Sequence, residues 1–262
     1  MNNINRIIAY GCSYTAGDEI MDHVALGISF EECNQLKREY LLKNEKSPNH
    51  TSKFKKDFNI RWDDPLHRNS SWAGQLAKLM NVSFENRATN GSGLDEQYFK
   101  IHHDYAQGLI LKDDLVLIGL TSMNRMIDFR SKTTTLISKN IPDDSGSRLL
   151  LDIYNDDYIV FHYFKTLDLF NGLRSKMRLL MQPMVDHMLP YQLNRLNVPN
   201  TRIFAKDIWK NSISNILLPE DYLRSPIVNG VKNKCAFGHP TLESHTELAE
   251  KIYKQIELDK LD

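Results

Sequence analysis

The 262-residue sequence has few cysteines, no excess of charge and no long hydrophobic run. Its three cysteines, Cys12, Cys33 and Cys235, include no CxxC pair, so we expect neither a disulfide framework nor a structural zinc site. The 33 basic and 33 acidic residues balance, which argues against nucleic acid or an anionic membrane as a partner. No apolar run approaches the roughly 18 residues of a membrane span. These absences predict a cytoplasmic protein with reduced thiols.

Motifs for metals and nucleotides are also missing. The histidines lack the HExxH spacing of a metal site, and GCSYTAG (residues 11–17) lacks the glycines of a phosphate-binding loop. We therefore expect no metal and no cofactor, and a flavodoxin-like nucleotide-binding protein is disfavoured. The sequence leaves the oligomeric state open.

Short apolar segments alternate with segments of helical periodicity along the chain. Strands are predicted near residues 7–11, 83–88, 115–120 and 202–205. Strands separated by helices favour a parallel sheet that is covered on both faces. The sequence thus predicts an α/β fold, a three-layer α/β/α sandwich, as a single domain over residues 1–262 with insertions near 20–68 and 130–200.

The helical segments differ in how clearly the sequence marks them. Helical spacing covers residues 28–42, whereas the lysine-rich residues 43–64 are interpreted as a solvated excursion. Ser70 or Ser71 can cap a helix with an apolar face, and Ser244–Glu247 has capping-box spacing before another such helix. The first face contains Trp72, Leu76, Leu79 and Met80; the second contains Leu248, Ala249, Ile252, Tyr253 and Ile256.

Two stretches in the second half of the chain are harder to interpret. Residues 153–164 are rich in aromatic side chains and fit either a strand or a helix. Residues 167–196 are predicted to be largely helical, with Pro183 and Pro190 bending or dividing the helix.

Small or hydrogen-bonding residues follow three of the predicted strands. They occur in GCS (11–13), NRATNG (86–91) and GLTS (119–122). Ligands of parallel α/β sheets gather outside the carboxyl ends of the strands. Together with His239 in CAFGHP, these segments form a set that fits acyl transfer. A tight-turn serine and a loop histidine remain the alternative interpretation.

The same segments resemble the conserved blocks of a known superfamily. GCSYTAG resembles the first block of SGNH/GDSL hydrolases, usually GDSxTxG, and NRATNGSG is similar to the second block. LIGLTS stands where that family has GxND, and AFGHP stands where it has DxxHP, so the blocks keep the family order. WAGQLAKLMNVSFENRATNGSG is also similar to SGNH-like proteins encoded by bacteriophages.

The resemblance implies a parallel, flavodoxin-like sheet and a role for several residues. Ser13 would be the nucleophile and His239 its general base, because a serine hydroxyl is a weak nucleophile until a base removes its proton. The backbone N–H groups of Ser13 and Gly91, with the Thr121 hydroxyl, would form the oxyanion hole. Asn90 and Arg125 are candidates for contacts with the substrate.

Two positions depart from the family pattern. Thr121 stands where the family has its oxyanion-hole asparagine, and Ala236 stands where it has the aspartate that orients the histidine. The ring of His239 must then be held through Nδ1 by a backbone carbonyl or by an acid remote in the sequence.

The functional prediction is ester hydrolysis through an acyl-serine intermediate. The substrate implied by the resemblance is a small-molecule or carbohydrate ester, with O-deacetylation of a carbohydrate as the named example. The alternative is a catalytically impaired SGNH-like binding module, because the two departures are what such a protein would show.

Overall fold

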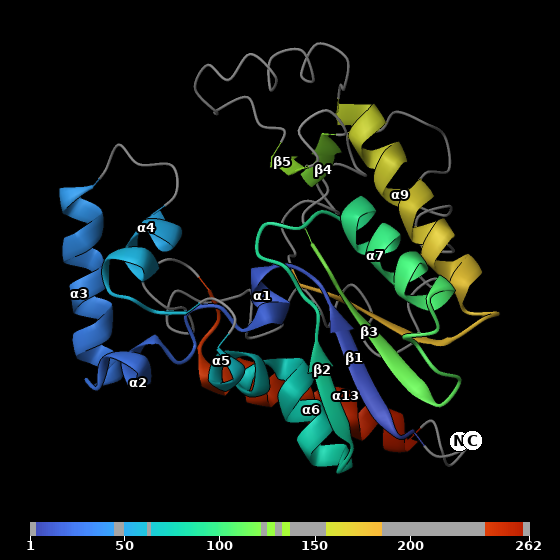
Figure 1. Ribbon diagram of the computed structural model, residues 1–262, viewed down its shortest axis with the longest axis horizontal. Helices are drawn as coiled ribbons and strands as arrows, with labels where there is room; N and C mark the ends of the chain where they lie inside the picture. The colour runs from blue at the N-terminus through green and yellow to red at the C-terminus, as the bar shows by residue number, and fades with distance from the viewer. Residues whose placement is uncertain are drawn as a thin grey trace.

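A computed structural model of the chain describes residues 4–44, 50–61, 64–121, 125–128, 133–136, 156–184 and 239–258. The predicted strand at 202–205, Ala236 and much of the predicted insertion at 130–200 lie outside these residues. Figure 1 shows a twisted sheet with helices on both faces and a group of helices beside it. Within the described residues, no helix is long and apolar enough to cross a bilayer.

The central sheet has four strands, all parallel, in the order β2-β1-β3-β6. Their bounds are β1 Arg6–Tyr10, β2 Ser83–Asn86, β3 Asp114–Leu120 and β6 Arg178–Pro183. Tyr10 pairs with Ile118 and Leu120 pairs with Pro183, so the carboxyl ends of the strands reach one edge of the sheet. The predicted α/β class and three of its strands are confirmed.

The prediction that residues 167–196 are largely helical is wrong for β6. Helix α9 (Asp156–Leu173) settles the open stretch at 153–164 as mainly helical, but the chain then turns into a strand. The sequence RLLMQP pairs with β3 along its length and buries its Leu and Met side chains. A parallel strand that is buried on both faces has no alternating pattern, so a short apolar run of this kind is easily mistaken for helix.

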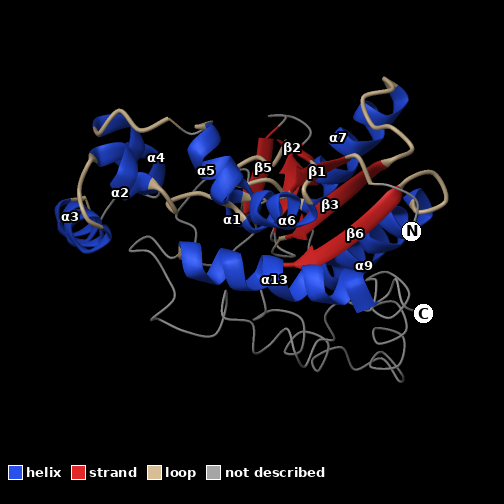
Figure 2. Cartoon of the chain, turned by 90° about the horizontal axis from the view of Figure 1, so that it is seen from below, coloured by secondary structure: helices blue, strands red, loops and turns tan. Residues whose placement is uncertain are grey.

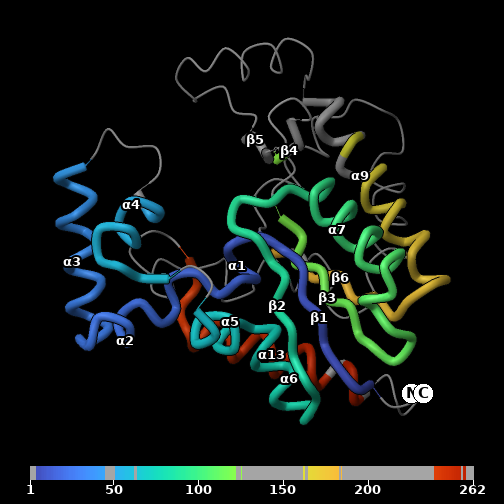
Figure 3. The backbone as a smooth tube through the Cα atoms, viewed as in Figure 1, coloured from blue at the N-terminus to red at the C-terminus, as the bar shows by residue number. Residues whose placement is uncertain are grey.

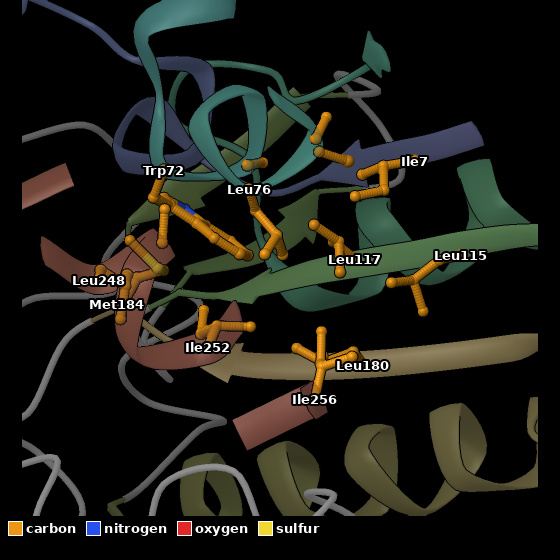
Figure 4. Close-up of a cluster of buried hydrophobic side chains, with 14 residues drawn as sticks. Ile7, Trp72, Leu76, Leu115, Leu117, Leu180, Met184, Leu248, Ile252 and Ile256 are labelled. Atoms are coloured by element: carbon orange, nitrogen blue, oxygen red, sulfur yellow. The ribbon is translucent and has the colours of Figure 1, made fainter. Parts of the chain in front are cut away.

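Among the described residues, helices cover both faces of the sheet (Figure 2). Helices α6 (Trp72–Met80) and α13 (Leu242–Leu258) pack on one face, and α7 (Leu94–Ala106) lies with α9 on the other. Figure 4 shows the core on the first side, where side chains of α6 and α13 meet those of β1, β3 and β6. The labelled members of this apolar cluster are Ile7, Trp72, Leu76, Leu115, Leu117, Leu180, Met184, Leu248, Ile252 and Ile256.

Helix α6 begins as predicted. Ser71 is its N-cap, and its Oγ accepts a hydrogen bond from the Gly74 N–H at 3.3 Å. Leu79, which was assigned to the apolar face, is instead 42% exposed. The buried side of the helix is formed by Trp72, Ala73, Leu76 and Ala77. Leu79 lies on a different side.

Helix α13 has the predicted apolar face but a different start. Leu248, Ala249, Ile252 and Ile256 are buried against the sheet. The helix begins at Leu242, and Thr241 Oγ1 accepts a hydrogen bond from the Ser244 N–H at 3.4 Å. The predicted capping box at Ser244–Glu247 is therefore wrong. Thr241 is an equally good cap one turn earlier, so the start was misplaced by one turn.

A group of short helices follows β1 and lies beside the sheet (Figure 3). Their bounds are α1 Ser13–Ala16, α2 Asp22–Leu26, α3 Phe30–Lys43, α4 His50–Asp57 and α5 Pro65–Ser70. Helix α3 confirms the helix predicted at 28–42, and a capping box between Ser29 and Glu32 marks its start. We call α2, α3 and α4 the helical insert.

The prediction that residues 43–64 form a solvated excursion is wrong for α4. Phe54 of α4 is fully buried, and its ring contacts the rings of Tyr40 and Phe58 at centroid distances of 5.2 and 4.5 Å. Phe54 and Phe58 are four residues apart, which places them on one side of a helical turn. The many lysines around them hid this short apolar stripe from the sequence interpretation.

Two further strands lie beyond β3. β4 (Arg125–Asp128) and β5 (Thr133–Leu136) pair antiparallel as a separate two-stranded sheet. β4 begins at Arg125, and the side chain of Arg125 contacts Thr121 at the carboxyl end of β3.

Candidate active site

Ser13 lies where β1 passes into α1, at the carboxyl edge of the sheet. It is the first residue of α1, and the N-cap is Cys12, whose side chain makes no capping hydrogen bond. Cys12 is fully buried, whereas Ser13 keeps 7% of its surface exposed. Ser13 therefore does not cap α1. Its backbone N–H lies in the first turn of a helix, where such groups have no intrahelical acceptor.

The glycines around Ser13 make room for Thr15. This side chain is fully buried between the carboxyl ends of β1 and β3. A Cβ atom added to Gly11 or to Gly119 would overlap with Thr15 Oγ1. The small residues of the first block thus allow two neighbouring strands to close around one threonine, which fixes the turn that carries Ser13.

The second block crosses the end of β1. The Thr89 N–H donates to the Gly11 carbonyl at 2.9 Å, and Asn86 Nδ2 donates to the Thr15 carbonyl at 2.9 Å. Gly91 follows with φ +80°, a left-handed conformation that side chains rarely adopt. An added Cβ at Gly91 would meet no atom within 4 Å. The glycine is therefore required by its backbone conformation, and it follows Asn90, whose side chain reaches Asp18.

Thr121 follows β3 at the same edge of the sheet. Tyr10, the last residue of β1, pairs with Ile118 of β3, so Thr121 lies just beyond the edge of the sheet at which β1 ends. Thr121 is 2% exposed, and its Oγ1 accepts a hydrogen bond from Arg125 Nη1 at 3.2 Å. Because arginine can only donate, this contact leaves the proton of the Thr121 hydroxyl available for another acceptor.

His239 is held by Glu19. Its Nδ1 lies 2.6 Å from Glu19 Oε2, and its backbone N–H donates to the same oxygen at 3.1 Å. The ring also packs against Tyr14, with a centroid distance of 5.3 Å. The second ring nitrogen, Nε2, lies 3.8 Å from Asp18 Oδ2, which is beyond hydrogen-bonding distance. The remote acid that the missing aspartate required is thus present, and it comes from the segment just after Ser13.

Glu19 and His239 each favour the charged form of the other. Burial disfavours the protonated ring, but the hydrogen bond to Glu19 and the charges of Asp18 and Glu19 outweigh it and raise the pKa of His239 above its ordinary value. Burial likewise opposes ionisation of Glu19, yet the hydrogen bond and charge of His239 and the charge of Lys37 lower the pKa of that carboxyl. Glu19 is therefore an ionised carboxylate in the protein interior.

Glu19 belongs to a buried group of charges that we call the ionic cluster: Asp18, Glu19, Asp22, Lys37 and Lys55. Lys37 Nζ lies 2.9 Å from Glu19 Oε1 and 2.8 Å from Asp22 Oδ2. Lys55 Nζ lies 2.7 Å from Asp18 Oδ1 and 2.9 Å from Asp22 Oδ1. His67 Nε2 adds a further contact to Asp22 Oδ1 at 2.9 Å. The two lysines come from α3 and α4, so the helical insert completes the cluster.

Contacts among the described residues bring the predicted site residues together in two groups. Asn90 Nδ2 lies 3.4 Å from Asp18 Oδ2, the same oxygen that faces His239, so Asn90 and His239 belong to one group. Thr121 and Arg125 form the second group. Ser13 and Gly91 lie on backbone segments that share the carboxyl edge of the sheet with both.

Sequence reasoning missed Glu19, Lys37 and Lys55. Asp18 and Glu19 directly follow the first block, GCSYTAG, which was the available signal for an acid near the site. Lys37 lies one helical turn after Cys33, on the buried side of α3. Lysines are almost never fully buried unless they are paired, so neither lysine was expected in the interior, and Lys55 was assigned to the solvated residues 43–64.

Comparisons with known proteins give likenesses of structure only. No family model and no curated protein matches the chain. A lipolytic protein of the G-D-S-L family from Veillonella parvula DSM 2008 is similar with a TM-score of 0.42 and 11% identity, covering 95% of this chain and 96% of that one. An acetyl xylan esterase, Est2A from Butyrivibrio proteoclasticus, is similar with a TM-score of 0.45 and 12% identity, covering 100% and 65%.

A further similar structure is a carbohydrate esterase whose active site is described as having divergent catalytic and non-catalytic binding functions. Its TM-score is 0.48 at 12% identity, with 98% of this chain and 69% of that chain covered. Since the identities and TM-scores are this low, the functional argument rests on the side chains of this chain.

Proposed function

We propose that the protein is a serine-dependent ester hydrolase in which Ser13 is the nucleophile, His239 the general base and Glu19 the acid that orients the base. The observation that carries the proposal is the 2.6 Å contact between Glu19 Oε2 and His239 Nδ1. An ionised carboxylate at Nδ1 keeps a proton on that nitrogen and leaves the lone pair of Nε2 free to accept the serine proton.

The reaction uses atoms at the carboxyl edge of the sheet. Ser13 Oγ attacks the ester carbonyl as its proton passes to His239 Nε2, and the alcohol leaves with that proton. A water then attacks the acyl-serine, with His239 again as base, which releases the carboxylic acid and restores Ser13. The N–H groups of Ser13 and Gly91 and the hydroxyl of Thr121 donate to the oxyanion, and each such donor typically contributes about 2.7–4 kcal/mol in the transition state.

For the substrate, we propose an acetyl ester of a carbohydrate. Asn90 and Arg125 would supply amide and guanidinium donors to hydroxyl groups of the alcohol. The choice follows the SGNH resemblance of the four sequence blocks, and an acetylated sugar is therefore the first substrate to assay.

A fluorophosphonate probe tests the mechanism directly, because it labels only an activated serine. The native protein should be labelled at Ser13, as located by mass spectrometry, and the heat-denatured protein should not. Ser13→Ala and His239→Ala should both abolish labelling and hydrolysis of an acetyl ester while keeping the thermal unfolding transition. Absence of labelling in the native protein would overturn the proposal and leave the non-catalytic binding module.

The pH profile gives a second test. A general base must be neutral, so kcat/KM should rise with pH through the pKa of His239. Because Glu19 and Asp18 raise the pKa of His239, the midpoint should lie above the ordinary value of about 6.5. Glu19→Gln removes the charge at Nδ1, so it should lower both kcat and this midpoint. An unchanged midpoint in that variant would show that Glu19 does not act on the base.

A further inference from the structure

The two oxygens of the Glu19 carboxylate have different partners. Oε2 receives His239 Nδ1 at 2.6 Å, and Oε1 receives Lys37 Nζ at 2.9 Å. Lys37 also reaches Asp22 Oδ2 at 2.8 Å, which fixes the ammonium group between two carboxylates. Rotation of the Glu19 carboxylate would therefore break a contact on each side.

The place of Lys37 in α3 is one where an apolar residue is the default. The side chain is 1% exposed, on the buried stripe of α3 that also carries Cys33 and Asn34. Its ammonium group lies 5.8 Å from the centroid of the Phe54 ring, so the helical insert encloses it from α4 as well. Burying an ammonium group costs several kcal/mol unless it is paired, which makes this position specific for a residue that binds carboxylates.

We propose that Lys37 is a positioning residue of the catalytic site, which clamps Glu19 so that the carboxylate keeps its contact with His239. This inference rests on the proposed ester hydrolysis. It gives the helical insert a function, because α3 then contributes to catalysis without touching the substrate.

Several other groups face His239 and must be separated from the effect of Lys37. Asp18 faces Nε2, the ring of Tyr14 packs on the imidazole, and Lys55 acts through its charge. His245 also lies near, but burial lowers the pKa of His245 to about 3, so it is uncharged. Lys55 is as buried as Lys37, and its ion pairs are with Asp18 and Asp22, which makes it the matched control.

Two roles for Lys37 give opposite pH effects. If Lys37 positions Glu19, its loss weakens the contact between Glu19 and His239, and the pKa of His239 falls toward its ordinary value. If Lys37 acts only through its positive charge, its loss leaves the negative charge of Glu19 less compensated. The protonated form of His239 is then favoured, and its pKa rises. Lys55→Met removes a positive charge near Asp18, so it should raise the pKa of His239 and keep the kcat of the high-pH plateau.

The experiment compares Lys37→Met with Lys55→Met in ester hydrolysis across pH. For Lys37→Met we expect the plateau kcat to fall about 10- to 100-fold, as for a misplaced catalytic group, with KM unchanged and the midpoint shifted to lower pH. In a Glu19→Gln background the same substitution should have no further effect on kcat. An unchanged plateau, or a midpoint shifted to higher pH, would overturn the positioning role.

A readout that needs no activity separates this inference from the proposed function. The imidazole of His239 can be titrated by NMR in the wild-type protein and in Lys37→Met, and the midpoint should be lower in the variant. If Lys37→Met does not fold, Lys37→Gln, which keeps an N–H donor, should show the same shift to a smaller extent. Equal midpoints would overturn the inference, whereas a wild-type protein without esterase activity or probe labelling would overturn the proposed function alone.

Discussion

The protein has two interiors of similarly low solvent exposure but opposite chemistry, since one is apolar and the other is charged. Between the sheet and helices α6 and α13, a cluster of buried apolar side chains comes from β1, β3, β6 and the two helices, with Met184 just beyond β6 (Figure 4). A short distance along the chain, the ionic cluster buries three carboxylates and two ammonium groups to a similar degree. Burial therefore does not predict composition in this molecule.

The two interiors are stabilised by different physics. In the sheet core, stability follows the apolar area removed from water, at roughly 25 cal/mol per Å². In the ionic cluster, each charge has lost its hydration and depends on a specific partner at 2.7–2.9 Å. In the first interior the cost of a substitution should follow the volume lost, whereas in the second it should follow the number of charged partners left unpaired.

The largest expected effect is from Asp22→Ala. Asp22 contacts Lys37, Lys55 and His67, so its loss leaves two buried ammonium groups with fewer partners. Breaking a buried ion pair by removing one partner typically costs about 3–5 kcal/mol in the free energy of unfolding. Urea denaturation measures the change, and a loss below about 1 kcal/mol would show that the cluster is not stabilised as a unit.

Leu76→Ala should cost about 2–5 kcal/mol, the usual range for a leucine truncated in a packed core. Leu76 is fully buried in α6 against the sheet. Since no charge is involved, the loss should be the same at pH 5 and pH 8, and it should not change with salt. A cost that depends on pH would mean that the two interiors are coupled.

Acidification should loosen the cluster before the sheet core. For Asp22, burial raises the pKa, but the hydrogen bond to His67 and the charges of Lys37 and Lys55 outweigh burial and lower it, and the pKa of Glu19 is also lowered. Carboxyls of this kind contribute stability above their unfolded pKa of about 4, and the contribution is lost as pH falls below it. His239 acts in the opposite direction: its raised pKa contributes stability below about 6.5, which is lost as pH rises through the folded value.

Amide hydrogen exchange can locate the acid effect in the structure. Between pH 5 and pH 3, after correction for intrinsic exchange rates, protection in α3 should fall more than protection in β1 and β3. A uniform loss of protection would show that the ionic cluster and the sheet core open together.

The smallest effect is expected for Lys100→Ala, which removes a surface pair instead of a buried one. Lys100 Nζ lies 2.6 Å from Glu96 Oε1 on α7, with both side chains partly exposed. Pairs four residues apart on a helix contribute about 0.2–0.5 kcal/mol. Thermal unfolding at low and high salt should show this difference, and a much larger one would mean that α7 depends on charge as the helical insert does.

The sequence predicted the apolar interior better than the charged one. Strands β1 and β3 have β-branched, continuously apolar segments, and their ends carry the motif residues, so local pattern was enough. β6 was mistaken for helix because a strand that is buried on both faces has no period of two. Helix α4 was missed because Phe54 and Phe58 stand among lysines, of which Lys55 is buried through ion pairs with Asp18 and Asp22 that the local sequence does not reveal.

The site divides in the same way. Ser13 and His239 were predicted from sequence blocks, and the expectation of a remote acid followed from the alanine at position 236. The identity of that acid could not be deduced, because the contact between Glu19 and His239 joins residues 220 positions apart and depends on the tertiary fold. The role proposed for Lys37 is harder still to predict, because it depends on the contact between Lys37 and Glu19.

The order of the catalytic groups along the chain has a consequence for protein synthesis. Ser13 and Glu19 leave the ribosome together, but His239 follows 220 residues after Glu19. At about 5–20 residues per second, roughly 10–45 s separate them. In the proposed mechanism, the nascent chain during that interval holds the nucleophile and the orienting carboxylate but no base, so it would not yet hydrolyse esters. Activity would begin only when α13, which follows His239, packs on the sheet. The first turnover would therefore indicate that folding is complete.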